Sequence, residues 1–275
     1  MVDATEASKP AVKSAIRAKL PELWMNYGLA IAAHLAVLLL WWAVTAFGGM
    51  PSFILPSPQE TLATLFDPTY RWGYNTMVTA VEIFVGYGLA IAFGVLLAML
   101  FTWFRTLRSA LFPLFVSISM VPKVALGPLL IVWFGYGIAT NIFFAFVIAF
   151  FPILITTARG LREVEPELLD LVRALKGTRW QIFRKIQLPG ALPYVFSSMK
   201  VGAILAVAGA IVGEFVASSE GLGYLMIQVQ ATLDTAAMFM AVLLLSLLGV
   251  VLFAIVVGLE RLLVVKDARL DSAPQ

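Results

Sequence analysis

Long apolar stretches separated by short polar segments dominate the pattern of this chain. A helix that crosses the ~30 Å hydrocarbon layer of a membrane needs about 20 mostly apolar residues. Six stretches meet that length, at residues 27–47, 76–101, 109–134, 138–158, 191–217 and 236–262. The third stretch contains three prolines and Lys123, so we expect a broken or kinked helix that its neighbours support. The pattern therefore predicts an all-α integral membrane protein with about six transmembrane helices.

The composition indicates the same class and excludes others. Of the 275 residues, 61% are hydrophobic and only 13% are charged, whereas soluble domains are about 45–50% apolar and about 25% charged. The chain has no cysteine, a single histidine and no Gly-Lys pair of a phosphate-binding loop. Thiolate metal sites, histidine-based zinc motifs and an ATPase site on this chain are thereby excluded. We expect no catalytic residue, no metal ligand and no cofactor on this chain, and an intramembrane enzyme is the least favoured reading.

Basic residues are distributed asymmetrically between the two sides of the predicted membrane. Of the 19 lysines and arginines, four lie in residues 1–26, two follow the second span, seven lie in residues 159–190 and three lie near the C-terminus. Since basic loops stay in the cytoplasm, both termini are expected there. The predicted organisation is a cytoplasmic lead (1–26), a transmembrane domain (27–263) and a cytoplasmic tail (264–275), with outer loops at 48–75 and 218–235.

The segment 159–190, which we call the elbow, is the only long cytoplasmic connection in this prediction. A helix is expected to begin at Pro166 and to end at Gly177, and a second short helix is expected from Trp180 to about residue 187, where Pro189 stops it. Neither helix is long enough to be stable by itself, so the apolar faces must pack against something. They either pack back onto the bundle or dock a soluble partner, and we favour docking.

The elbow resembles a known motif. It is similar to the EAA loop of permease subunits of bacterial ATP-binding cassette importers, whose pattern is Glu-Ala-Ala, three residues, Gly, then Ile-x-Leu-Pro. With Leu188 and Pro189 aligned, Asp170 falls at the glutamate and Lys176 at the glycine. Gly177, one place later, is expected to supply the positive φ of the turn. Residues 121–137 and 213–228 resemble the sulfonate/taurine/nitrate/bicarbonate branch, and the likeness runs from about residue 76 to residue 263.

The resemblance implies a type I importer permease of the bacterial inner membrane, without nucleic-acid partners. A homodimer would form the translocation pathway, two separate subunits would bind ATP and Mg²⁺, and a periplasmic or lipoprotein binding protein would deliver substrate. The implied ATPase-coupling residues are Asp170, Leu171, Val172, Leu175, Lys176, Gly177, Trp180 and Phe183. Implied contacts for the binding protein are Pro56, Ser219, Glu220 and Gly221.

The resemblance leaves the substrate open. A small anion such as a sulfonate, taurine, nitrate or bicarbonate is expected first, and the alternative is a neutral or cationic metabolite such as a pyrimidine precursor. A secondary transporter is less favoured, because it would show inverted repeats with paired broken helices.

Small and ionisable residues within the spans form the last pattern. Small residues four apart allow close helix packing, and charged groups within the membrane mark functional sites. The two stripes are Glu82, Gly86, Ala90, Gly94 and Ala98 in the second span, and Gly202, Ala206, Ala210 and Glu214 in the fifth. We expect Lys123 to meet Glu82 or Glu214, within one chain or across a dimer; the alternative is that it attracts an anionic substrate. Lys200 is expected to extend to the cytoplasmic surface.

Overall fold

The computed structural model describes residues 9–164 and 166–264, with side chains from residue 28 onward except those of residues 166 and 173. Within these residues every regular element is a helix or helical turn. The α-helices are α1 (Lys9–Phe47), α2 (Pro58–Ala63), α3 (Trp72–Trp103), α4 (Arg105–Ser119), α5 (Gly127–Phe134), α6 (Ile138–Gly160), α7 (Pro166–Ala174), α8 (Arg179–Ile182), α9 (Leu188–Ala217), α10 (Leu222–Ala231) and α11 (Thr235–Leu263). The short turns are η1 (Thr64–Phe66), η2 (Pro68–Tyr70), η3 (Lys123–Leu126) and the π-helical η4 (Phe183–Gln187).

The predicted ends of the chain are only partly described. Residues 1–8 of the expected lead and residues 265–275 of the expected tail lie outside the described residues. The backbone of residues 9–26 continues the first span as part of α1.

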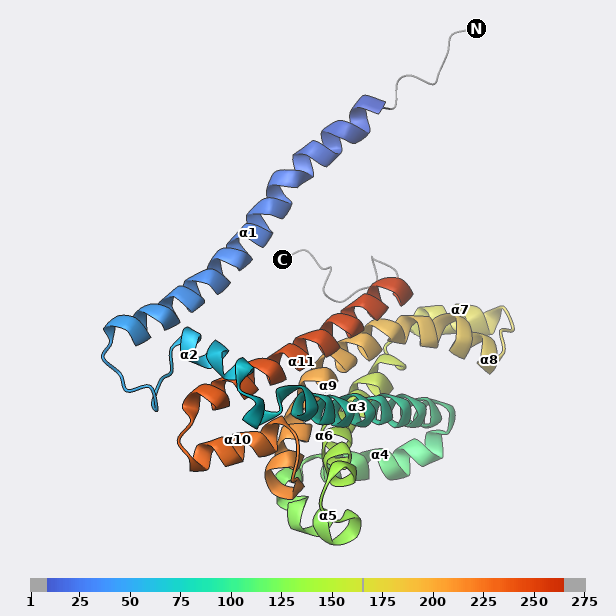
Figure 1. Cartoon of the computed structure of the whole chain (residues 1–275). Helices are drawn as coiled ribbons and strands as arrows, with labels where there is room; N and C mark the ends of the chain where they lie inside the picture. The colour runs from blue at the N-terminus through green and yellow to red at the C-terminus, as the bar shows by residue number, and fades with distance from the viewer. Residues whose placement is uncertain (1–8, 165, 265–275) are drawn as a thin grey trace.

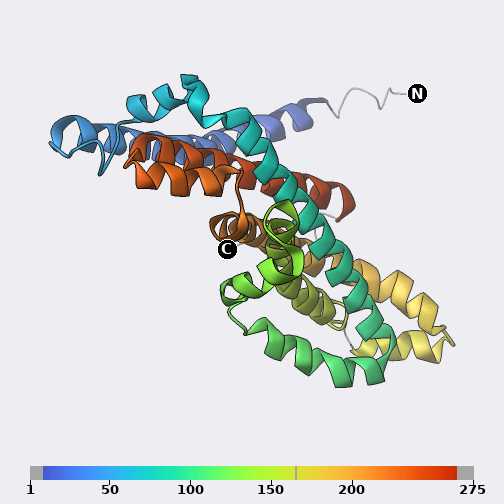
Figure 2. The same cartoon turned by 60° about the horizontal axis from the view of Figure 1, so that its bottom comes forward.

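Five of the six predicted spans are confirmed as single helices, and the third predicted span is a bent helix pair. Five helices (α1, α3, α6, α9 and α11) are long and apolar enough to cross a membrane, and α4 with η3–α5 makes a sixth if the bent pair is one span. That pair is bent by 90°, and Figure 2 shows it curving beside α6. The break follows from Pro122, whose extended backbone stands between the two helices and which has no N–H to continue α4.

Helix α6 forms the centre of the bundle, with α3 and α9 packed along it. Every member of the two predicted small-residue stripes is buried, which confirms close packing. A Cβ added at Gly86 of α3 would lie 2.6 Å from the Cβ of Ala145, and one added at Gly209 of α9 would lie 2.7 Å from the Cα of the same residue. Backbone contact at α6 therefore requires glycine on both neighbouring helices.

Replacing Gly86 with alanine is expected to destabilise the bundle by about 1–3 kcal/mol, because the new methyl group overpacks the α3–α6 contact. Gly88 on the same helix provides a matched control, since nothing lies within 4 Å of a Cβ added there. Thermal unfolding of the purified protein should show a lower midpoint for Gly86→Ala than for Gly88→Ala. Equal midpoints would contradict the packing argument.

Helix α1 stands apart from the bundle (Figure 1). None of its apolar window, Gly28–Phe47, is buried against the rest of the chain. Its end is held by Trp41, which donates a hydrogen bond to the carbonyl of Pro56 over 3.0 Å and lies 5.7 Å from the ring of Phe239 in α11. The apolar surface of α1 thus faces the surroundings of the chain rather than its core.

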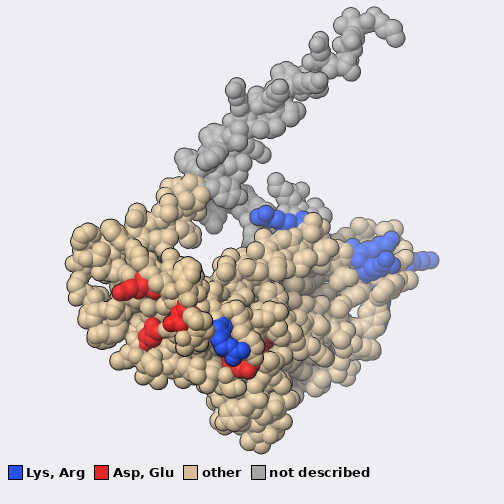
Figure 3. All heavy atoms as spheres, in the orientation of Figure 1, with Lys and Arg blue, Asp and Glu red and all other residues tan. Residues whose placement is uncertain are grey.

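Two ends of the bundle differ in character. The elbow end carries α7 and α8, and the opposite end carries α2 and α10 (Figure 1). Basic side chains gather over α7 and α8 in Figure 3, whereas acidic ones lie near α2 and α10. Both predicted outer loops contain helices: α2 lies in 48–75, and α10 makes most of 218–235 regular. Helix α10 forms because its apolar face, including Leu222, Leu225 and Val229, is buried in a cluster with α11.

The expectation for Lys200 was wrong. Its ammonium lies 3.0 Å from a carboxylate oxygen of Glu260 in α11, and the two side chains are only 12% and 6% exposed. An ion pair is available at the same depth, so the lysine does not need to extend to the membrane surface. The pair joins α9 to α11 near the elbow end.

Candidate functional site

The turn after α7 is closed by a recognisable helix-ending motif. The N–H of Leu175 donates to the carbonyl of Leu171 over 3.0 Å, and the N–H of Gly177 donates to that of Val172 over 2.8 Å. Lys176 between them has a left-handed φ of 56°. This is the Schellman arrangement, in which the left-handed residue directly precedes the residue whose N–H bonds to the carbonyl five residues earlier. The expectation that Gly177 supplies the positive φ is therefore wrong: Lys176 supplies it.

Gly177 is required in the turn for a different reason. A Cβ there would lie 2.4 Å from Cγ1 of Val172 and 2.9 Å from its carbonyl oxygen. The turn thus has one position that favours glycine by conformation, occupied by lysine, and a second that requires glycine by close approach.

Replacing Lys176 with glycine is expected to stabilise the elbow by up to about 1 kcal/mol, since glycine adopts a left-handed φ without steric cost. Replacing Gly177 with valine is expected to destabilise it by about 1–3 kcal/mol through the clash with Val172. Hydrogen exchange at the backbone amides of residues 171–182 should slow in the first variant and accelerate in the second. The same direction of change in both would contradict this geometry.

The second elbow helix differs from the expectation at both ends. It begins one residue earlier, because Thr178 and Gln181 form a capping box in which each side chain accepts a hydrogen bond from the backbone N–H of the other, over 2.8 and 3.3 Å. It does not stop at Pro189, since α8, η4 and α9 run as one continuous helical segment. The π-turn widens the backbone just before Pro189, with the N–H of Leu188 bonded to the carbonyl of Phe183, which makes room for the proline ring.

The elbow combines a buried aromatic anchor with apolar side chains that stay exposed. Phe183 is buried, with its ring 5.6 Å from Trp103 at the end of α3 and 5.9 Å from Trp180. Three further apolar side chains of the elbow are largely uncovered: Leu171 is 57% exposed, Leu175 is 74% exposed and Trp180, although its ring stacks on Phe183, is 55% exposed. We call Leu171, Leu175 and Trp180 the elbow surface. Asp170 is exposed and Val172 is half-buried, both on α7.

The structure brings both predicted glutamates into one buried polar cluster near the opposite end. Glu82 is 0% exposed and accepts a hydrogen bond from Nδ2 of Asn141 over 2.7 Å. Glu214 is 1% exposed and accepts bonds from the hydroxyl of Thr79 and the N–H of Gly223. The two carboxyl groups lie close enough to interact with each other. One oxygen of Glu82 and the amide oxygen of Asn141 have no hydrogen-bond partner among the described residues.

Lys123 does not join this cluster within one chain. Its ammonium donates to the carbonyl of Ser119, four residues earlier, and lies 5.2 Å from the ring centre of Phe151. The break between α4 and η3 explains this position, because it turns the lysine back towards the carbonyl end of α4, where a cation is favoured. A contact with a glutamate of a second copy stays a prediction.

The four residues expected to contact a binding protein are placed differently. Ser219 is exposed, and Glu220 accepts a hydrogen bond from Tyr74 over 2.6 Å. Gly221 is buried with a φ of 102°, and a Cβ there would lie 2.4 Å from the Glu214 carboxyl group. Pro56 is buried too. Ser219 and Glu220 therefore lie at the surface, whereas Gly221 and Pro56 are buried and are not available for a contact.

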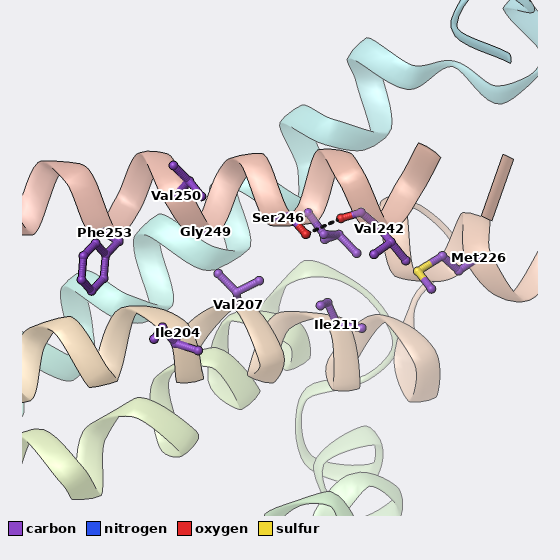
Figure 4. A pocket seen from close by; sticks show the side chains of 10 residues that line it. Ile204, Val207, Ile211, Met226, Val242, Ser246, Gly249, Val250 and Phe253 are labelled. Carbon is purple, nitrogen blue, oxygen red and sulfur yellow. Dashed lines mark hydrogen bonds between the residues drawn. The ribbon is translucent and has the colours of Figure 1, made fainter. Parts of the chain in front are cut away.

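An apolar cavity of about 500 Å³ lies between α9 and α11 (Figure 4). Its lining includes Ile204, Val207, Val250 and Phe253, and its only hydroxyl, on Ser246, bonds to the carbonyl of Val242 in its own helix. It has no polar group left to orient a polar substrate. We therefore do not assign it to the transport pathway.

Comparison with known proteins gives a consistent family. Residues 90–265 match the model of the binding-protein-dependent transport system inner membrane component. A probable ABC transporter permease protein of Haemophilus influenzae is 36% identical, over 79% of this chain and 89% of its own length. The riboflavin transport system permease protein RibX of Chloroflexus aurantiacus is 35% identical, over 88% of this chain and 90% of its own. The formylaminopyrimidine transport permease protein ThiX of Halalkalibacterium halodurans is 31% identical, over 83% and 92%.

Less similar relatives carry the names of the branch expected from the motifs. They include a putative aliphatic sulfonates permease of Bacillus subtilis (27% identical) and the taurine permease TauC of Escherichia coli (24%). Among solved structures, an inward-facing form of the MetNI methionine ABC transporter matches with a TM-score of 0.53 and 23% identity, over 67% of this chain and 94% of that one. It supports the fold alone. The family match over residues 90–265 and the 36% identity to the Haemophilus influenzae permease agree with the multi-pass helical architecture. This chain therefore belongs to the inner-membrane permease components of binding-protein-dependent ABC transporters.

Proposed function

We propose that this chain pairs with a second copy to form the pathway of an ATP-driven importer, and that separate ATPase subunits grip its elbow. The observation that carries the proposal is the elbow surface. Leu171, Leu175 and Trp180 stay exposed although both helix ends at the elbow turn are capped and the elbow is anchored through Phe183. An apolar face held rigidly outside the core is typical of an interface with another protein.

The membrane orientation follows from the charges. The elbow end carries the basic side chains seen over α7 and α8, so we place it, with both termini, in the cytoplasm. ATP and Mg²⁺ would then bind to the partner subunits there. The opposite end, with Ser219 and Glu220 at its surface, would receive the binding protein.

Replacement of the elbow surface tests the coupling. The double variant Leu171→Gln with Leu175→Gln should reduce co-purification with the cognate ATPase, and ATP hydrolysis stimulated by the binding protein, by at least about tenfold, because contacts at the centre of an interface dominate its free energy. The control is Leu171→Met with Leu175→Met, which keeps both positions apolar and should leave coupling intact. Undiminished coupling in the double variant would refute the proposal.

For the substrate we propose a nitrogen heterocycle of the pyrimidine-precursor type rather than a small anion. Two relatives above 30% identity are named for riboflavin and formylaminopyrimidine, whereas a relative named for sulfonates is 27% identical and one named for taurine is 24% identical. The ammonium of Lys123 is also occupied by a carbonyl and a ring of its own chain. Calorimetric titration of the cognate binding protein with formylaminopyrimidine, riboflavin and taurine distinguishes these classes. Binding of taurine alone would restore the small-anion reading.

A further inference from the structure

A second cavity, of about 410 Å³, lies between α4 and α6 at the elbow end. It combines charged with apolar side chains, whereas the cavity between α9 and α11 has no charged lining residue. Its lining residues are Arg108 and Phe112 from α4, Ile155, Ala158 and Arg159 from α6, and Arg162 and Glu163 directly after α6.

The two helices repeat one pattern in opposite directions. On α4, Phe112 follows Arg108 by four residues; on α6, Ile155 precedes Arg159 by four. Since α4 runs away from the elbow end and α6 runs towards it, each helix places its arginine at the rim and its apolar side chain one turn deeper. The cavity is therefore basic at its mouth and apolar inside.

The basic mouth has little compensating negative charge. Arg159 lies 3.6 Å from Glu163, and both side chains are largely exposed. Arg105 and Arg162 are near enough to Arg108 to repel it. In the part of the chain that the structure describes, neither Arg108 nor Arg162 forms an ion pair or a side-chain hydrogen bond. An anion with several oxygens would relieve this repulsion, and the guanidinium fork matches phosphate geometry.

The depth of the cavity identifies the kind of anion. Arg159 is the twenty-second residue of α6, so it lies about 32 Å along the helix from its first residue, just beyond a ~30 Å hydrocarbon layer. The arginines thus stand at headgroup level, while Phe112 and Ile155 stand at the level of the acyl chains. A free phosphate would use only the mouth, and an acidic peptide of a soluble subunit would not reach the apolar part.

We propose that this cavity binds an acidic phospholipid, with its phosphate between Arg108 and Arg162 and the first methylenes of an acyl chain against Phe112 and Ile155. Basic pockets between helices at a membrane surface are suited to such headgroups. The site is separate from the elbow surface, so it stands whether or not the coupling proposal holds.

The test measures lipid retention by the purified full complex in nanodiscs of phosphatidylcholine with phosphatidylglycerol, read by native mass spectrometry. The wild type should retain phosphatidylglycerol in preference to phosphatidylcholine. Each arginine near such a surface contributes a factor of about five in binding, so the variant Arg108→Gln with Arg162→Gln should lose about 25-fold in preference. Arg162→Gln alone, at an exposed position after α6, should lose about fivefold and serves if the double variant does not fold.

Three further arms make the result decisive. The control Arg71→Gln, which removes the cation stacked on Tyr74 at the opposite end, should keep the preference. Adding inorganic phosphate should leave the retained lipid in place, and removing the ATPase subunits should not change retention. Equal lipid preference in the wild type and both cavity variants, displacement by phosphate alone, or retention that depends on the ATPase would each overturn the proposal.

Discussion

Replacing Glu260 with leucine is expected to lower the free energy of unfolding by about 3–5 kcal/mol. The reason is the buried ion pair between Glu260 in α11 and Lys200 in α9, whose charged atoms are 3.0 Å apart. Removing either residue takes the opposite charge at 3.0 Å away from an ion whose side chain is at most 12% exposed, and lost compensation of a charge is costly within a membrane. Lys200→Met should have a similar effect for the same reason.

The double variant separates the free energy lost when one charge of the pair is removed from the net contribution of the whole pair to stability. Lys200→Met combined with Glu260→Leu removes both charges, and such apolar replacements are often neutral or stabilising. We therefore expect its thermal unfolding midpoint in detergent to lie near that of the wild type and well above those of the single variants. A double variant as unstable as the singles would show that the pair contributes through packing instead.

The hydrophobic pattern of the sequence predicted most of the architecture correctly. The six spans and both small-residue stripes follow from the length of apolar runs and from a repeat of four residues, and these rest on local periodicity alone. The broken third span was also predictable, because proline has a fixed local effect. The short helix α10 was missed, since its ten residues are too few to stand out from an outer loop.

The pairing of polar groups across helices was harder to predict from the sequence. Lys123 was assigned by depth to the glutamates, but depth does not give the rotation of a helix, and a 90° break reoriented the lysine. Asn141 was overlooked because its partner lies 59 residues away in sequence. Thr79 was accessible in principle: it lies three residues before Glu82, on the buried face of the same helix.

The elbow shows a similar division. Its two helices followed from spacing, but the left-handed residue was assigned to Gly177 from residue type, while the chain places Lys176 there. The hydrogen bond from Gly177 to Val172 fixes that register, and such a closing bond depends on where the preceding helix ends. The capping box at Thr178 and Gln181 is a local signal that could have been recognised in the sequence alone.

Replacing Glu214 with leucine is expected to be the second most damaging change, with a loss of about 2–4 kcal/mol of stability near the opposite end. Its carboxyl group accepts the N–H of Gly223 at the start of α10 and the hydroxyl of Thr79 from α3. Thr79 in turn accepts the N–H of Leu222 over 2.9 Å, so both first amides of α10 depend on this pair. The substitution should free the turn 218–223 from the bundle.

The functional consequence should be confined to that end. Basal ATP hydrolysis by the complex should persist in Glu214→Leu, whereas stimulation by the binding protein should fall about tenfold or more, because the turn that carries Ser219 and Glu220 loses its fixed position. Thr79→Val should reproduce a milder form of the defect. Ser246→Ala is the matched control for loss of a hydroxyl, since that group bonds only within its own helix, and it should behave like the wild type. An equal loss of basal and stimulated hydrolysis would contradict a local role for Glu214, because a change confined to the α10 end should spare the basal rate.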